Sequence, residues 1–419
     1  MVTDVTREKI LWISNEGTIY FKKPTSVLSA FDENETRAVR GFHATIPGYE
    51  PTPLCNLKSL AETLGIGGLY LKDESFRFGL NAFKALGGVY AIARYLAGRL
   101  GRDISRLSCT DLMSEETKKI TGDVTFATTT DGNHGRGVAW TARLLHQKAV
   151  VRMPKGSSKH RCELIANEGA SVTIRDVNYD ESVRLTAQEA SGQGWVVVQD
   201  TAWPGYEEIP LWIMKGYGTM VDEAIEQMSA NGAGKPTHVF IQAGVGSLAG
   251  AVQAIFRNRF PERPPRVIVA ESNRADCYYR SAIAGDGRPR AVTGDLDTLM
   301  AGLACGEANS IAFDILRDYA SAFVSCPDYV AARGMRVLGN PLAGDPRVCS
   351  GESGALTAGL LTYVMQDESL AGLRDALKLD KNSTVVLFST EGDTDPSRYR
   401  RVVWDGEFPT CEVMSEPTK

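Results

Sequence analysis

Seven short runs of apolar and β-branched residues recur along this 419-residue chain, with helix-like stretches between them. The runs lie at 123–130, 149–154, 171–174, 195–200, 238–244, 266–272 and 384–390. Apolar runs of this length that alternate with helices are typical of parallel strands whose two faces are both covered. The pattern therefore predicts an α/β fold with two parallel-rich, twisted sheets flanked by helices.

The length of the chain favours two packed domains over one. A stretch at 204–236, rich in proline, aromatic residues and glycine, separates the first four runs from the last three. We predict a larger, discontinuous domain made of residues 1–85 and 225–419, and a smaller domain made of residues 86–224. The active site is expected between them.

Charge and hydropathy exclude some partners. The net charge is -5 and the basic residues form no cluster, so nucleic acid is not expected to bind. No apolar run reaches the roughly 18 residues that a membrane span needs. The opening residues 1–17 mix charged with apolar positions, unlike a signal peptide. We therefore expect a cytoplasmic protein without a membrane segment.

Cysteine and histidine spacings predict no metal site. The eight cysteines form no CxxC pair, and the five histidines show no ligand spacing. Most of the cysteines are expected to be reduced and buried. A disulfide between Cys277 and Cys305 stays open, although a reducing compartment disfavours it.

Ligands of parallel α/β sheets bind at the carboxyl ends of the strands, where three glycine-bearing turns stand out. The first, QAGVGSLAGAV at 242–252, leads from a predicted strand into a helix. Its main-chain amides would form a phosphate cradle at the helix start. These amides belong to Gly244, Val245, Gly246, Ser247 and Leu248. A merely tight turn, or a degenerate nucleotide-binding turn, is the alternative.

The second turn, TTDGNHG, also connects a predicted strand to a helix. The side-chain amide of Asn133 is expected to hydrogen-bond a planar ligand. We assign the substrate carboxylate to Thr130, Gly132 and His134, near the amides of the turn. Asp131 would repel that carboxylate, so it either caps the helix or faces a cationic part of the substrate.

The third turn, in STEGDTDP, follows the last predicted strand with two hydroxyl residues, Ser389 and Thr390. Either hydroxyl could form a neutral hydrogen bond with a ring nitrogen. Such residues at strand ends also cap turns, which is the alternative.

Lys84 lies in SFRFGLNAFKALGG, a tight and mostly apolar segment. A lysine that forms a Schiff base needs a lowered pKa, a carbonyl compound and an anchor for that compound. Together with the three turns, Lys84 predicts pyridoxal 5'-phosphate as cofactor. Its aldehyde would bond Lys84, its phosphate the first turn, its ring oxygen Asn133, and its ring nitrogen a hydroxyl of the third turn. Taken alone, a lysine such as Lys84 is more often a solvated residue at a helix start; the combination with the three turns favours the cofactor.

These segments resemble, in the same order from about residue 50 to 395, the fold type II pyridoxal-phosphate enzymes. That family includes threonine dehydratase, threonine synthase and cysteine synthase, and its cofactor lysine lies in an FK motif that matches Lys84. The resemblance implies a two-domain fold and, by analogy, a homodimer.

Within the family, dehydratases carry serine where this chain has Asp131. The segments QDTAWPGYEEIPLWIM, TLMAGLACGE and STEGDTDP resemble the branch that acts on 2,3-diaminopropionate. The resemblance implies an ammonia-lyase of amino-acid degradation, whose α,β-elimination gives pyruvate and ammonia from both the D and the L isomer. A carboxylate suits the second amine of this substrate. Asp131 is the first candidate; Asp200, which could also be a strand-end cap, is the second, for the amine or for proton transfer.

Two enantiomers would require a base on each face of the α-carbon, and we assign Lys84 to one face and Asp131 to the other. The alternative within the family is a serine or threonine dehydratase that tolerates Asp131. Outside it, the first turn could belong to a nucleotide-binding oxidoreductase, or the chain could be a non-catalytic ligand sensor.

Overall fold

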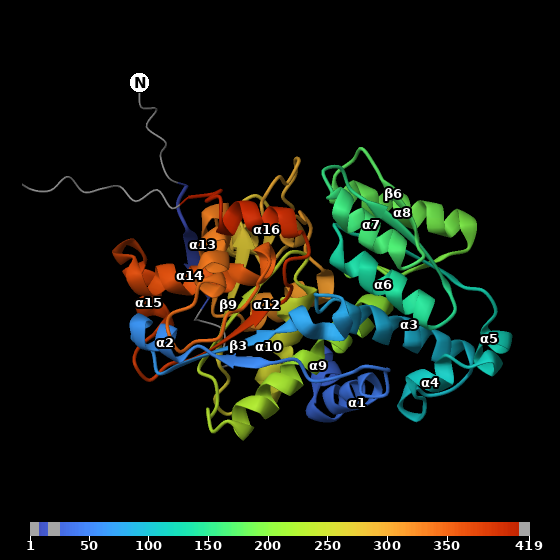
Figure 1. Cartoon of the computed structure of the whole chain (residues 1–419), viewed down its shortest axis with the longest axis horizontal. Helices are drawn as coiled ribbons and strands as arrows, with labels where there is room; N and C mark the ends of the chain where they lie inside the picture. Colours follow the sequence, from blue (N-terminus) through green and yellow to red (C-terminus); the bar gives the residue numbers. More distant parts are fainter. Residues whose placement is uncertain (1–7, 16–25, 410–419) are drawn as a thin grey trace, which may run out of the picture.

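The computed structural model describes residues 8–15 and 26–409. Most of the opening segment behind the cytoplasmic prediction therefore lies outside the described residues. Two sheets organise the fold, and helices surround both of them (Figure 1). The predicted α/β architecture with two parallel-rich sheets is confirmed.

The larger sheet has seven strands in the order β1-β10-β9-β8-β11-β3-β2. Its inner strands run parallel, whereas the edge strands β1 and β2 pair antiparallel with their neighbours. The strands are β1 (Leu11–Ser14), β2 (Leu54–Asn56), β3 (Gly68–Asp73), β8 (His238–Gln242), β9 (Arg266–Ser272), β10 (Ala322–Cys326) and β11 (Thr384–Ser389).

The smaller sheet is entirely parallel, with strand order β6-β5-β4-β7. Its strands are β4 (Thr125–Thr129), β5 (Lys148–Met153), β6 (Ser171–Ile174) and β7 (Val196–Val197). All four lie within residues 86–224, the range predicted for the smaller domain. The domain boundaries themselves stay a prediction.

The helices lie between and around the sheets. In the first half of the chain they are α1 (Glu33–His43), α2 (Lys58–Leu64), α3 (Ala85–Arg99), α4 (Cys109–Leu112), α5 (Glu115–Thr121), α6 (Asn133–Leu144), α7 (Lys159–Asn167) and α8 (Tyr179–Gln193). In the second half they are α9 (Glu208–Ala230), α10 (Ser247–Arg259), α11 (Cys277–Ala284), α12 (Ser310–Tyr319), α13 (Asp328–Gly339), α14 (Glu352–Gln366), α15 (Ala371–Leu377) and α16 (Pro396–Val403). Short 3-10 turns are η1 (Ser26–Phe31), η2 (Glu74–Gly79), η3 (Ile104–Arg106), η4 (Ala301–Leu303) and η5 (Glu368–Leu370).

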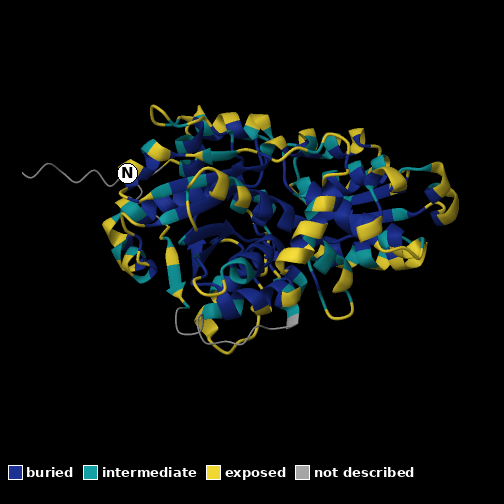
Figure 2. Cartoon of the chain, turned by 90° about the horizontal axis from the view of Figure 1, so that it is seen from below, coloured by how far each residue is buried: buried dark blue, intermediate teal, exposed yellow. Residues whose placement is uncertain are grey.

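Both faces of the larger sheet are buried. Along β8, Val239 and Ile241 belong to one apolar cluster, whereas Phe240 between them belongs to another. Successive side chains of a strand point to opposite faces, so an uninterrupted apolar run needs cover on both sides. Buried residues fill the interior and exposed ones form the rim (Figure 2).

Helix α3 joins the two sheets, because it packs against both α6 and α9. The contacts are close: a Cβ at Gly216 of α9 would lie 2.5 Å from the Leu86 oxygen, and one at Gly137 of α6 would lie 2.9 Å from Ala85 Cα. Glycine lets both backbones approach the first turn of α3. Lys84, the N-cap residue of α3, is thereby placed between the two sheets.

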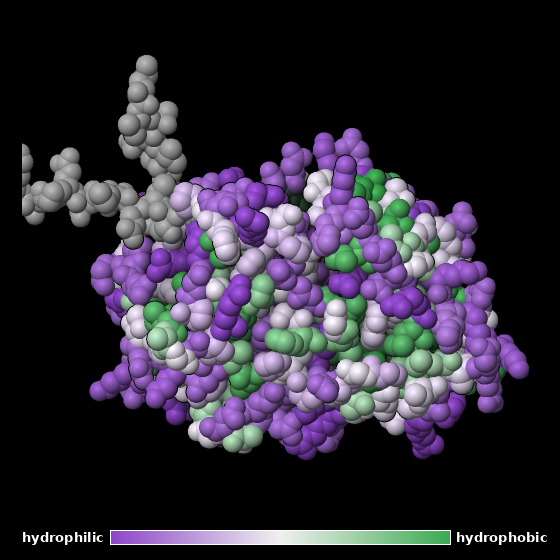
Figure 3. Space-filling model, viewed as in Figure 1, coloured by the Kyte–Doolittle hydropathy of each residue, from purple (hydrophilic) through white to green (hydrophobic). Residues whose placement is uncertain are grey.

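The outer surface shows mostly hydrophilic residues, with apolar patches between them, on the face seen in Figure 3. Within residues 8–15 and 26–409, no helix combines the length and the apolar character that crossing a bilayer requires.

Candidate active site

Two cavities near the start of α3 share five lining residues, which are Lys84, Asp131, Asp200, Gly302 and Cys305. Most of the residues predicted for the site line one cavity or both. The cavity linings include Lys84, Thr130, Asp131, Asn133, His134, Asp200, the whole 244–248 turn and Thr390. Gly132 and Ser389 are absent from these linings.

The 244–248 turn connects β8 to α10 and has the features of an anion cradle. Gly246 has φ of 93°, and a Cβ there would lie 2.0 Å from Tyr278 Oη, so only glycine fits. None of the described residues accepts a hydrogen bond from the amides of this turn. Free amides at a helix N-terminus bind a phosphate group well. The turn therefore fits the phosphate of pyridoxal phosphate.

Lys84 and the buried Asp200 form a partly buried ion pair, with 2.6 Å between Nζ and Oδ2. Burial by itself lowers the pKa of Lys84, but the negative charge of Asp200 outweighs burial and raises the pKa well above its ordinary value. Burial likewise acts to raise the pKa of Asp200, and the Lys84 charge lowers it instead. The expected lowering of the Lys84 pKa is therefore wrong for this arrangement, because the ion pair holds the ammonium charged.

The other carboxylate oxygen of Asp200 accepts two further hydrogen bonds. Tyr179 Oη donates to Asp200 Oδ1 over 3.2 Å, and Gln199 Nε2 donates to the same atom over 3.3 Å. These contacts fix the carboxylate toward Lys84.

Asn133 contacts the third turn through Glu391, a residue for which the sequence predicted no role. The Asn133 amide donates to Glu391, which directly follows Thr390. Burial raises the pKa of Glu391 to about 7, and Glu352 adds to the effect. Its position beside the two predicted hydroxyls in STEGDTDP was the signal that could have identified it.

The two candidate hydroxyls differ in their surroundings. Thr390 lines the cavity, and its Oγ1 accepts from Gln242 Nε2 over 2.8 Å, which leaves the hydroxyl hydrogen able to donate. Ser389 instead bonds to Ser350 Oγ over 2.8 Å and lies outside the linings. The geometry favours Thr390 as the partner of a ring nitrogen.

The residues predicted for the substrate carboxylate surround the start of α6. Thr130 Oγ1 accepts a hydrogen bond from the Gly132 amide over 2.9 Å. His134 Nε2 donates to the Val198 carbonyl over 2.8 Å, and burial lowers the pKa of His134, so its ring is neutral. Its Nδ1 then offers an acceptor rather than a donor. The role of His134 in carboxylate binding stays a prediction.

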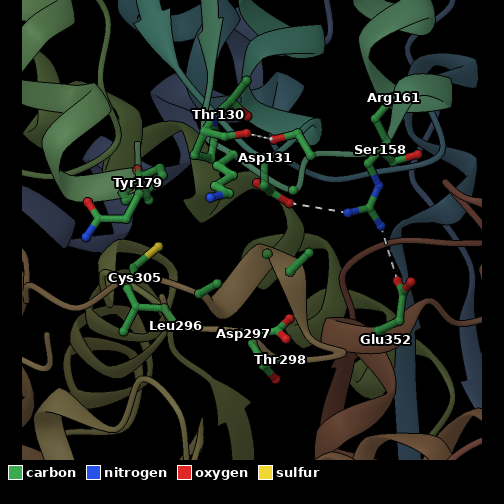
Figure 4. A pocket seen from close by; sticks show the side chains of 18 of the residues that line it. Thr130, Asp131, Ser158, Arg161, Tyr179, Leu296, Asp297, Thr298, Cys305 and Glu352 are labelled. Atoms are coloured by element: carbon green, nitrogen blue, oxygen red, sulfur yellow. Dashed lines mark hydrogen bonds and ion pairs between the residues drawn. The ribbon is translucent and has the colours of Figure 1, made fainter. Parts of the chain in front are cut away.

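Asp131 is held by an arginine for which the sequence predicted no role. Arg161 Nη1 lies 3.5 Å from Asp131 Oδ2, and Arg161 Nη2 lies 3.3 Å from Glu352 Oε2 (Figure 4). These three side chains come from segments far apart in the sequence, which is why spacing did not reveal them.

The disulfide left open between Cys277 and Cys305 is absent, because both residues are buried free thiols.

Comparison with known proteins agrees with this geometry. Residues 45–390 match the family described as pyridoxal-phosphate dependent enzyme. The chain is 51% identical over 388 residues to the diaminopropionate ammonia-lyase of Escherichia coli strain K12, covering 93% of this chain and 95% of the relative. It is 50% identical over 382 residues to the enzyme of that name from Salmonella typhimurium, covering 91% and 95%.

Solved structures give the same result. The crystal structure of the Escherichia coli diaminopropionate ammonia-lyase in complex with D-serine has a TM-score of 0.88 and 48% identity, over 96% of this chain and 98% of the other. The same enzyme with an aminoacrylate–PLP azomethine reaction intermediate has a TM-score of 0.87 and 49% identity, over the same shares. The resemblance drawn from the sequence is confirmed: this chain belongs to the pyridoxal-phosphate dependent enzymes.

Proposed function

We propose that this protein is an ammonia-lyase that converts 2,3-diaminopropionate to pyruvate and ammonia with pyridoxal phosphate. The proposal rests on one observation: Lys84 lines the same cavity as two carboxylates, Asp131 and Asp200, and as the 244–248 turn with its free amides. About half of the residues are identical to the two diaminopropionate ammonia-lyases over nine-tenths of the chain, which supports the same substrate.

Pyridoxal phosphate, when bound, supplies an aldehyde for amines and a ring that withdraws electrons from the substrate α-carbon. Lys84 Nζ must lose a proton before it can bond an aldehyde. Asp200 Oδ2 lies 2.6 Å away and can relay that proton, but the lowered pKa of Asp200 means that it does not keep it. The 244–248 amides would hold the phosphate, and Thr390 would offer a neutral hydroxyl to the ring nitrogen. A hydroxyl partner would stabilise electron density drawn into the ring less than a carboxylate partner would, which suits rapid loss of the β-group.

Charge in the cavity explains the choice of a diamino acid. The second amine of 2,3-diaminopropionate can carry a positive charge, and Asp131 and Asp200 can pair with it. The same carboxylates can stabilise this amine as it leaves protonated. A serine hydroxyl has no such charge, so the site discriminates against hydroxy amino acids.

Substrate comparison tests the proposed function. Pyruvate release from 2,3-diaminopropionate should exceed keto-acid release from serine or threonine by roughly 30-fold or more in kcat/KM, since a lost buried charge pair costs about 2–5 kcal/mol. Faster turnover of serine or threonine would instead establish the dehydratase alternative.

Asp131→Asn tests the division of work between the two faces of the α-carbon. We propose that Lys84 and Asp131 each remove the α-proton of one isomer. The variant should lose about 100-fold in kcat for one isomer, the usual scale of general-base catalysis, and little for the other. Separate assays with D- and L-2,3-diaminopropionate measure this, and an equal loss for both isomers refutes the assignment.

We further propose, by analogy with the family, that the enzyme is a cytoplasmic homodimer with the two-domain division 1–85 plus 225–419 and 86–224. Sedimentation of the purified protein measures the oligomeric state, and a monomer over the working concentration range would refute the dimer.

A further inference from the structure

Arg161 of α7 lies among carboxylates at one side of the cavity and is only 5% exposed. Its guanidinium contacts Asp131 through Nη1 and Glu352 through Nη2, and Nη2 also donates to Thr394 Oγ1 over 3.1 Å. Glu352 begins α14, which packs on β8 and β11 of the larger sheet, and Thr394 follows β11. One side chain thus joins the Asp131 loop of the smaller sheet to two segments of the larger one. Figure 4 shows its contacts with Asp131 and Glu352.

The Asp131 carboxylate depends on this arginine for its orientation. Within the described part of the chain, Arg161 is the one side chain that pairs with Asp131. Without the guanidinium, Asp131 and Glu352 would lose the cation between them, and their charges would repel each other. The carboxylate would then turn away from the position that it holds beside Lys84.

The surroundings of Arg161 argue against direct binding of the substrate carboxylate. Burial opposes its charge, yet the pKa is raised well above its ordinary value by four nearby carboxylates, which belong to Glu352, Asp131, Glu391 and Asp395. A further carboxylate from the substrate would be repelled by these groups. The buried Arg161 Nε has no acceptor among residues 8–15 and 26–409, so the test below separates binding of the substrate carboxylate from positioning of Asp131.

We propose that Arg161 is a positioning residue, which holds the Asp131 carboxylate over the cavity by tying it to Glu352. This inference rests on the function proposed above, because it acts through the role of Asp131 in proton transfer.

The test compares Arg161→Gln with Asp131→Asn and with the double variant, using both isomers of 2,3-diaminopropionate. In Arg161→Gln, kcat should fall about 10- to 100-fold for the isomer that Asp131→Asn impairs, the scale of a misplaced catalytic group. KM for both isomers, and kcat for the other isomer, should change less than about threefold, because Arg161 does not itself bind the substrate. The double variant should be no slower than Asp131→Asn, because both changes remove one interaction.

Two further variants keep the test decisive if Arg161→Gln fails to fold. For the isomer that Asp131→Asn impairs, the kcat of Arg161→Lys should lie below that of the wild type and above that of Arg161→Gln. A single ammonium cannot span both carboxylates. Glu352→Gln should lower turnover of the same isomer, by a smaller factor. If the ratio of kcat for the two isomers is the same in both variants as in the wild type, the proposal is overturned.

Arg152→Gln is the matched control. Arg152 lies in β5, the strand that precedes α7. Its side chain is 12% exposed, and it pairs with Glu189 over 2.6 Å, away from the cavity linings. The ratio of its kcat values for the D and the L isomer should equal that of the wild type. The thermal unfolding midpoint and the absorbance of bound cofactor, measured for every variant, report on folding and cofactor binding independently of turnover.

Three outcomes would contradict the proposal or its basis. An equal rise in KM for both isomers would show that Arg161 binds the substrate carboxylate. An equal fall in kcat for both, together with a lower unfolding midpoint or lost cofactor absorbance, would show a purely structural role. A wild type that releases no pyruvate from either isomer would refute the proposed function itself.

Discussion

Replacing Lys84 by alanine is expected to abolish the near-visible absorbance of the protein-bound cofactor. Pyruvate release should fall by a factor on the order of 10³ or more, because the same change removes the covalent attachment and a base. Asp200 would lose its ion pair but would keep the Tyr179 and Gln199 donors, so the protein should still fold. Absorbance spectroscopy and a keto-acid assay on the purified variant measure both effects.

Lys148→Ala is the control for this prediction. Lys148 is an exposed lysine that pairs with Asp123 at the protein surface, so its loss should leave absorbance and turnover unchanged. A Lys84→Ala protein with the wild-type spectrum and rate would remove Lys84 from the mechanism.

The second large effect concerns stability. Glu223 of α9 lies in a fully buried network, where Lys72 Nζ is 2.7 Å and Arg77 Nη2 is 2.8 Å from its carboxylate. Arg77 also pairs with Glu74 over 2.8 Å. Glu223→Gln would leave one buried positive charge uncompensated, and should lower the free energy of unfolding at pH 7 by about 3–5 kcal/mol. Urea unfolding of the two proteins measures the difference.

The pH dependence of this difference follows from the pKa of Glu223. Burial by itself raises that pKa, but the hydrogen bonds and charge of Arg77 outweigh burial and lower it to about 2. The stabilisation is therefore complete above the unfolded pKa of about 4.3 and is lost as the pH falls through the folded value. The gap between wild type and Glu223→Gln should narrow in acid.

Glu226→Gln provides the comparison for Glu223→Gln, because Glu226 lies on the same helix, 64% exposed, and pairs with Arg40. It should change the free energy of unfolding by less than about 1 kcal/mol. Equal effects of the two substitutions would contradict the importance of the buried network. That network includes Glu74 and Arg77 of η2, which ends five residues before Lys84, so its loss should also loosen the segment that carries the lysine.

The fold was predictable where apolar pattern alone decides the structure. All seven predicted runs contain strands. Five of these strands lie inside a sheet, where apolar cover is needed on both faces, whereas β6 and β7 are the edges of the smaller sheet. The strands β1 and β2 were missed because they are antiparallel edges of only four and three residues. The inner strand β10 was missed as well, although it is fully buried, because its apolar run AFVSC is short and includes a serine. β3 was missed because its buried end carries Lys72 and Asp73, which only tertiary ion pairing and capping make tolerable.

The site was predictable where function depends on local motifs. The glycine turn and Lys84 are weak signals when each is taken alone, but together they predict the cofactor, and the structure brings them to one cavity with Asp131 and Asp200. The Arg161 and Glu352 contacts could not be predicted, because they join residues 191 positions apart. The raised pKa of Lys84 also depends on a tertiary contact, since Asp200 lies 116 positions further along the chain.

An absorbance spectrum of the wild-type protein supplied with pyridoxal phosphate, recorded before and after 2,3-diaminopropionate is added, tests the central claim most directly. We expect a near-visible band of protein-bound cofactor that changes on addition of substrate while pyruvate is released. A spectrum of free cofactor alone, unchanged by the substrate and without pyruvate release, would contradict the claim that this cavity performs the elimination.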